Sequence, residues 1–183
     1  AVRLNNKGVR EILAHTEEMR DLYAGSTAKN PALQIAKSLV GNYPVIYSAH
    51  ERLDAVNLRW RGQIQENAKQ VAFGNFFPEM NHNEINGWQF PKGKTKAFSV
   101  LLLRDQDDHK RTQLRFDALK DIIKGAVADV TTLEGKGATL LGRMFSLIYL
   151  GDWVSWHLAA LIKTDPSPVP VIQQLKAKLA KAR

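Results

Sequence analysis

Cysteine is absent from the 183-residue sequence, which excludes both a disulfide framework and a metal site built from thiolates. The absence also fits a protein of the reducing cytoplasm. No basic segment followed by an apolar run stands at the start, so we expect no secretion.

Neither a P-loop nor a dinucleotide-binding fingerprint occurs. The turn Glu134-Gly-Lys-Gly137 is therefore open to two interpretations, an anion site or a tight turn before a helix.

The charge balance is basic, with a formal net charge of +8. Such a balance attracts nucleic acid, but it attracts phosphorylated metabolites as well. The basic residues are spread along the chain, and the cluster from Lys176 to Arg183 is equally typical of a solvated helix face. We therefore expect no nucleic-acid partner. Apolar residues make up 44% and charged residues 24% of the chain, which is normal for a globular domain with its own core.

The segment 137–162 is apolar on nearly all sides, so a membrane span is the first alternative to test. Arg143, Asp152 and His157 lie inside it. A charged residue at the centre of a bilayer costs about 2.5–3.5 kcal/mol. We therefore predict a buried core helix and no membrane partner.

Strand-like and helical patterns alternate along the chain, which is typical of a parallel sheet covered on both faces. The fold class expected is α/β, a three-layer αβα sandwich with a flavodoxin-like parallel sheet and ligands at the carboxyl ends of its strands. Residues 1–27 are expected to form a linker or arm helix, and residues 28–183 a single domain. The predicted strands are 44–48, 71–73, 97–103 and 126–133; the predicted helices are 5–23, 31–40, 51–67, 112–124, 137–162 and 169–181.

Glu66 and His82 stand sixteen residues apart with a strand-like segment between them. A carboxylate base and an imidazole in this layout suit proton transfer on a small substrate. Taken alone, the local sequence favours ordinary roles, an exposed last-turn Glu66 and a helix-capping loop around His82. Glu79, His82 and Glu84 resemble a metal-ligand set, but no second histidine stands at ligand spacing, so we expect no metal.

Three stretches together add a resemblance. They are RWRGQIQENAK at 59–69, PEMNHNEINGW at 78–88 and LGDWVSWHLAALIKTDPSPVPVIQQLK at 150–176. In this order they resemble the C-terminal half of the bacterial and archaeal bifunctional phosphoglucose/phosphomannose isomerases, which belong to the sugar isomerase (SIS) domain superfamily. The middle stretch is the most specific, and the resemblance covers nearly the whole chain.

The resemblance implies roles for six residues. By their positions in the motifs, Glu66 is the base that moves a proton between C1 and C2, His82 assists ring opening, and Lys176 lies near the ring oxygen. Within the same motifs, the resemblance suggests substrate-binding roles for Arg61, Asn67 and Asn81.

The reaction implied is aldose–ketose isomerisation, in which glucose 6-phosphate and mannose 6-phosphate reach fructose 6-phosphate through one cis-enediol. The resemblance implies no metal or organic cofactor. It also implies a homodimer, because in the family the histidine reaches a site completed by the neighbouring subunit.

The chain departs from the family in length and in its first strand. Family members are about twice as long and carry an N-terminal SIS domain with Ser/Thr-rich phosphate loops, whereas Tyr47-Ser48-Ala49-His50 stands at the end of the first predicted strand here. We therefore expect the C-terminal domain of a larger isomerase, lacking its N-terminal SIS domain. The alternative is a non-catalytic SIS domain that binds a sugar phosphate and regulates a partner. Such a domain would not need both Glu66 and His82.

Overall fold

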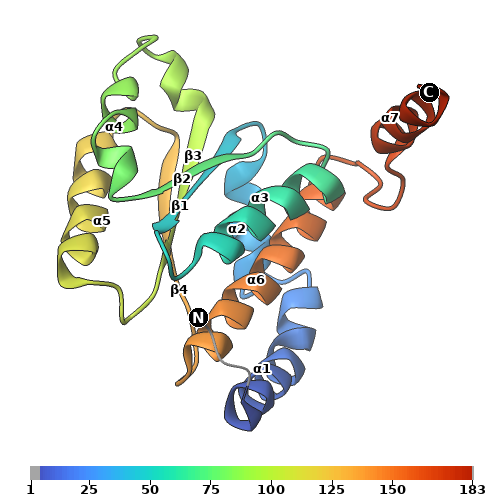
Figure 1. Cartoon of the computed structure of the whole chain (residues 1–183), viewed down its shortest axis with the longest axis horizontal. Coiled ribbons are helices and arrows are strands. Elements are labelled where there is room, and N and C mark those ends of the chain that lie inside the picture. Colours follow the sequence, from blue (N-terminus) through green and yellow to red (C-terminus); the bar gives the residue numbers. More distant parts are fainter. Residues whose placement is uncertain (1–4, 183) are drawn as a thin grey trace.

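Residues 5–182 are described by the computed structural model (Figure 1), in which four parallel strands form one sheet ordered β2-β1-β3-β4. The strands are β1 (Tyr43–Ala49), β2 (Phe73–Phe77), β3 (Phe98–Arg104) and β4 (Asp129–Glu134). The helices are α1 (Asn6–Ala24), α2 (Pro31–Leu39), α3 (Asp54–Asn67), α4 (Glu84–Gly87), α5 (Lys110–Ile123), α6 (Leu140–Leu161) and α7 (Pro170–Lys181), with short 3-10 turns η1 (Glu79–Asn81) and η2 (Lys94–Ala97). The strand order confirms the flavodoxin-like parallel sheet.

Two apolar layers cover the sheet, because successive strand residues point to opposite faces. On one face Ile46 and Leu101 pack with Trp60 of α3 and Leu158 of α6. On the other face the core includes Tyr47, Phe77, Met80, Trp88, Val100, Leu102 and Phe116. Figure 1 shows α4 and α5 on one side of the sheet and α2, α3 and α6 on the other. The predicted three-layer sandwich is confirmed.

Helix α1 packs against α6 and contributes Met19 and Tyr23 to the core. Its Glu11 carboxylate accepts hydrogen bonds from the backbone N–H of Thr139 (3.0 Å) and from the Thr139 hydroxyl (2.7 Å). His157 of α6 also contacts this region, since its Nε2 lies 2.6 Å from the Tyr23 carbonyl oxygen. The expectation of an arm outside the core is therefore wrong for α1, while the domain boundary at residue 28 stays a prediction.

Strand β2 begins two residues later than predicted and runs to Phe77. Ala68 ends α3, Lys69 adopts a left-handed backbone (φ 55°), and the Gln65 side chain donates to the Ala72 carbonyl at 2.9 Å. These contacts hold residues 68–72 in a connector, so the chain pairs with β1 only from Phe73 onward. Likewise β4 starts at Asp129 rather than at residue 126, because the Ala126 N–H bonds to the Ile123 carbonyl in a turn.

Helix α6 is the predicted core helix, with Leu147, Val154 and Leu158 almost fully buried. No helix within residues 5–182 is both long enough and apolar enough to span a bilayer. The predicted final helix is present as α7, but it extends away from the rest of the chain (Figure 1) and none of its described side chains is buried.

Candidate active site

Glu66 is exposed in the last turn of α3. Because α3 connects two parallel strands, it runs antiparallel to them, and its end lies at the amino edge of the sheet. There Glu66 lines a cavity of about 250 Å³ together with Gln65, Lys69 and the residues 169–172. The predicted base thus faces the beginning of the helix that carries Lys176.

Lys69 ties these two segments together. Its Nζ donates to the Glu66 carbonyl at 2.5 Å and to the Pro166 carbonyl at 3.1 Å, so the linker between α6 and α7 is held against the end of α3. Lys176 itself is exposed and lies six residues after Pro170, about 9 Å along the helix axis.

His82 lies at the other edge of the sheet. Strand β2 carries the chain to its carboxyl end, and His82 follows the turn η1, exposed to solvent, with its N–H bonded to the Glu79 carbonyl at 3.0 Å. The strand between Glu66 and His82 is five residues long, about 16 Å at the rise of a parallel strand. None of the cavities lined by Glu66 in the described structure includes His82.

Arg61 faces a different cavity from Glu66. Its stem crosses Gly74, where an added Cβ would lie 2.9 Å from Arg61 Cδ, and its Nε is buried without an acceptor among the described residues. The cavity has a volume of about 610 Å³, and Phe73 and Trp88 are among its lining residues. Arg61 and Glu66 therefore do not converge on one cavity within this chain.

The two predicted asparagines make contacts within the fold. Asn67 donates to the Ser155 hydroxyl at 2.8 Å and so joins α3 to α6. Asn81 accepts from Arg115 Nη1 at 3.3 Å. These contacts hold the ends of the motifs in place, and substrate binding by Arg61, Asn67 and Asn81 stays a prediction.

The crevice between the carboxyl ends of β1 and β3, where we expected a ligand, holds an ion cluster. Arg143 of α6 donates to Asp105 (2.6 Å) and to Asp107 (2.6 Å), and Arg52 donates to Asp105 at 3.1 Å. Burial, the largest single cause, would raise the pKa of Asp105, but Arg143, the Asp107 N–H and Arg52 together outweigh it and hold that pKa below its usual range. Burial raises the pKa of the neighbouring Asp108. Sequence reasoning missed this cluster, whose members lie up to 91 positions apart in the chain.

The turn Glu134-Gly-Lys-Gly137 is likewise not an open anion site. The helix that follows it starts at the N-cap Thr139, and the Glu11 carboxylate already bonds to the Thr139 N–H and hydroxyl. A carboxylate of the chain itself therefore occupies the place that a phosphate would take.

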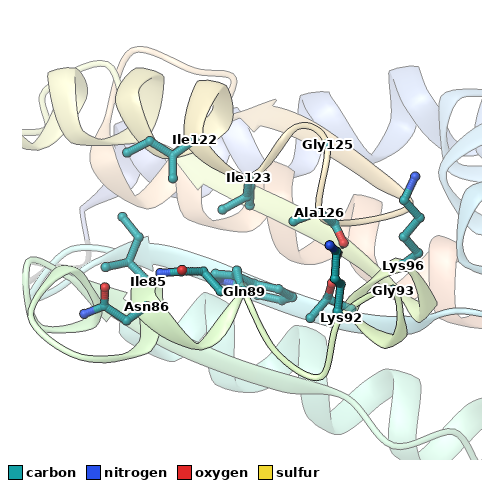
Figure 2. A pocket seen from close by; sticks show the side chains of 12 residues that line it. Ile85, Asn86, Gln89, Lys92, Gly93, Lys96, Ile122, Ile123, Gly125 and Ala126 are labelled. Atoms are coloured by element: carbon teal, nitrogen blue, oxygen red, sulfur yellow. Dashed lines mark hydrogen bonds between the residues drawn. The ribbon is translucent and has the colours of Figure 1, made fainter.

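A further cavity of about 790 Å³ lies between the loop after α4 and the end of α5. Figure 2 shows Ile122 and Ile123 on one side, Ile85 on the other, and Lys92 and Lys96 at one end. None of the six predicted site residues lines it. Among residues 5–182 no group of three or more histidine, aspartate or glutamate side chains is arranged to hold a metal ion.

Residues 28–179 match the sequence profile of a family described as "Bacterial phospho-glucose isomerase C-terminal SIS domain". The chain is 41% identical over 177 residues to a bifunctional phosphoglucose/phosphomannose isomerase of Caldicellulosiruptor bescii, covering 96% of the chain and 52% of that protein. It is 40% identical over 153 residues to the protein of the same name from Aquifex aeolicus, covering 84% and 47%. The chain thus spans about half the length of these curated relatives.

Solved structures support the fold. A glucose-6-phosphate isomerase like protein from Thermus thermophilus superposes with a TM-score of 0.73 at 18% identity, covering 93% of the chain and 56% of that structure. The C-terminal domain of glucosamine-fructose-6-phosphate aminotransferase from Francisella tularensis gives a TM-score of 0.65 at 11% identity, covering 87% and 45%.

Proposed function

The chain belongs to the family of bacterial phospho-glucose isomerase C-terminal SIS domains, and from this premise we propose that it is the catalytic C-terminal half of an aldose–ketose isomerase. The substrates proposed are glucose 6-phosphate and mannose 6-phosphate, each interconverted with fructose 6-phosphate. The observation that carries the proposal is the place of Glu66, an exposed carboxylate that shares a cavity with the start of the helix bearing Lys176.

In the proposed mechanism His82 and Lys176 assist ring opening. Glu66 then takes the proton from C2 of the open-chain aldose, the electrons of that C–H bond form the C1=C2 double bond, and the C1 carbonyl oxygen takes up a proton to give the cis-enediol. Loss of the proton on O2 and return of the proton from Glu66 to C1 then give the ketose. The two aldoses are epimers at C2, and both lose that stereocentre in the enediol, so one site serves both.

The wide separation of Glu66 and His82 supports a homodimer in which the two groups come from different subunits. The N-terminal SIS domain is proposed to supply the phosphate-binding donors. A 6-phosphate needs convergent N–H, hydroxyl or guanidinium donors, and in the cavity at the carboxyl edge of this sheet Arg52 stands beside the carboxylates of Asp107 and Asp108. A cytoplasmic location, which the lack of cysteine suggests, remains part of the proposal.

The alternative, a regulatory domain that binds a sugar phosphate without catalysis, is less well supported. It would need an anion site within this chain. The crevice at β1 and β3 contains the Asp105–Arg143 cluster, whose Arg143 guanidinium is already bonded to Asp105 and Asp107, and the start of α6 already holds the Glu11 carboxylate.

A coupled assay with fructose 6-phosphate tests the proposal. The purified chain should be nearly inactive, and activity should appear when the separately expressed N-terminal SIS domain is added. The reason is that an unheld substrate forfeits the orientation effect, which reaches roughly 7–11 kcal/mol in well-oriented systems. High activity of the chain alone would disprove the need for the other domain. Inactivity of the assembled protein on all three sugar phosphates would disprove the isomerase.

A further inference from the structure

We propose that Glu84 is the positioning residue for His82, because its carboxylate fastens the loop after β2 to two neighbouring strands of the sheet. This inference rests on the proposed function in one respect, the action of His82 on the substrate. The fastening itself follows from contacts within the chain.

Glu84 is bonded through both carboxylate oxygens. The hydroxyl of Tyr47 on β1 donates to Oε1, and the Nδ2 of Asn75 on β2 donates to Oε2 at 2.6 Å. Tyr47 and Asn75 are register partners on adjacent strands, so their side chains leave the same face of the sheet side by side. One carboxylate on α4 thus joins two strands.

The partners of Glu84 are matched to a carboxylate. The side chain of Tyr47 is fully buried, and burial, followed by the nearby Glu84 carboxylate, raises the pKa of Tyr47 far above its ordinary value, so the phenol stays a donor. The Oδ1 of Asn75 already accepts the Phe76 N–H at 2.8 Å, which leaves its amide NH₂ to face Glu84. Two donors therefore converge on two acceptor oxygens.

His82 lies within the segment that these bonds fix. Met80 on one side of it is fully buried and Trp88 on the other side is nearly so, whereas His82 between them is exposed. Asn83 caps α4 by accepting the Glu84 N–H at 2.5 Å, so the anchor begins two residues after the imidazole. A backbone fixed in this way limits the directions that the ring can take before the substrate arrives, which lowers the ordering needed for reaction.

Exchanging the acid and the amide between positions 84 and 75 tests the contact between Glu84 and Asn75. Glu84→Gln leaves one acceptor oxygen for the two donors, and Asn75→Asp places two carboxylates together, but the double variant restores one donor facing one acceptor. The readout is hydrogen exchange of the backbone amides of His82 and Asn86, which bond to Glu79 and Asn83. Either single variant should speed this exchange at least tenfold, and the double variant should recover most of the protection.

Glu79→Gln is the matched control. Glu79 lies in the same loop, and its substitution by Gln removes the same charge as Glu84→Gln. Glu79 is exposed, however, and its carboxylate has only a 3.4 Å contact with Asn83. Its exchange rates should equal those of the unmutated chain. Unchanged exchange in Glu84→Gln, or equal loss in both variants, would overturn the anchoring role.

The link to His82 is tested in the assembled isomerase with two substrates. Fructose 6-phosphate must open its ring, whereas 5-deoxyfructose 6-phosphate lacks the 5-hydroxyl and cannot close one. Glu84→Gln should lower kcat about tenfold or more on the first substrate and by less than twofold on the second, with KM nearly constant. The double variant should recover kcat on the first substrate.

Equal losses on both substrates would mean a general structural role and would overturn the positioning of His82. If the unmutated assembly isomerises neither substrate, the proposed function fails, and the positioning of His82 for catalysis fails with it. The exchange measurement then still decides separately whether Glu84 fastens the loop.

Discussion

Glu66 and His82 lie at opposite ends of strand β2, the carboxylate at the amino edge of the sheet and the imidazole beyond the carboxyl edge. In one copy of the chain the strand itself separates them by about 16 Å. The proposal that both groups act on a single hexose therefore implies that they come from two copies of the chain. The predictions below begin from this relationship.

Glu66→Gln in the assembled isomerase should lower kcat by roughly 10²–10⁴-fold, because the change removes the base and keeps the shape of the side chain. KM should change little. Glu17→Gln, an exposed residue on α1, is the control and should keep full activity. A steady-state assay in both directions measures the effect, and activity of Glu66→Gln within tenfold of the unmutated protein would rule out Glu66 as the base.

A mixture of subunits tests whether the site is shared. Homodimers of Glu66→Gln and of His82→Ala should each be nearly inactive. When the two variants are mixed and allowed to exchange, half of the dimers are mixed and each has one intact site, so about one quarter of the unmutated activity should return. No recovery after proven exchange would show that both groups act within one subunit.

Glu11→Gln should destabilise the chain in a pH-dependent way. Hydrogen bonds from the Thr139 hydroxyl and N–H lower the pKa of Glu11 below its ordinary value of 4.5. The contribution to stability is therefore complete above about pH 4.5 and is lost as the pH falls through the lower folded-state value. Melting curves should show a lower Tm for Glu11→Gln than for the unmutated chain near neutral pH. The difference between the two Tm values should shrink as the pH falls below about 4.5. Glu17→Gln should show no such trend.

Arg143→Met should cost about 3 kcal/mol of unfolding free energy, because it leaves the buried Asp105 carboxylate with Arg52 as its remaining cation. Urea denaturation measures the loss. The double variant Arg143→Met/Asp105→Asn should be more stable than the single variant, since no buried charge then lacks its partner. A single variant as stable as the unmutated chain would show that the cluster is unimportant for folding.

Local patterns predicted a large part of the fold. Within the predicted helix 51–67, Leu53, Val56, Trp60 and Ile64 recur at helical spacing, and all four are buried. The segment 97–103 was predicted as a strand because it is apolar except for Ser99, and β3 is buried on both faces. The family resemblance also identified Glu66 and His82 as the residues to examine, although their catalytic roles stay predictions.

The sequence by itself determined the alternation of strands and helices, the parallel sheet and the family, because periodicity and short motifs act over a few neighbouring residues. Only the tertiary structure decided which distant residues meet. Glu11 reaches Thr139 across 128 positions, Arg143 reaches Asp105 across 38, and Tyr47 reaches Glu84 across 37. Such pairs depend on how the helices and strands pack together, and a local sequence pattern does not predict that packing. For the same reason, the spacing that singled out Glu66 and His82 did not show that the sheet holds them apart.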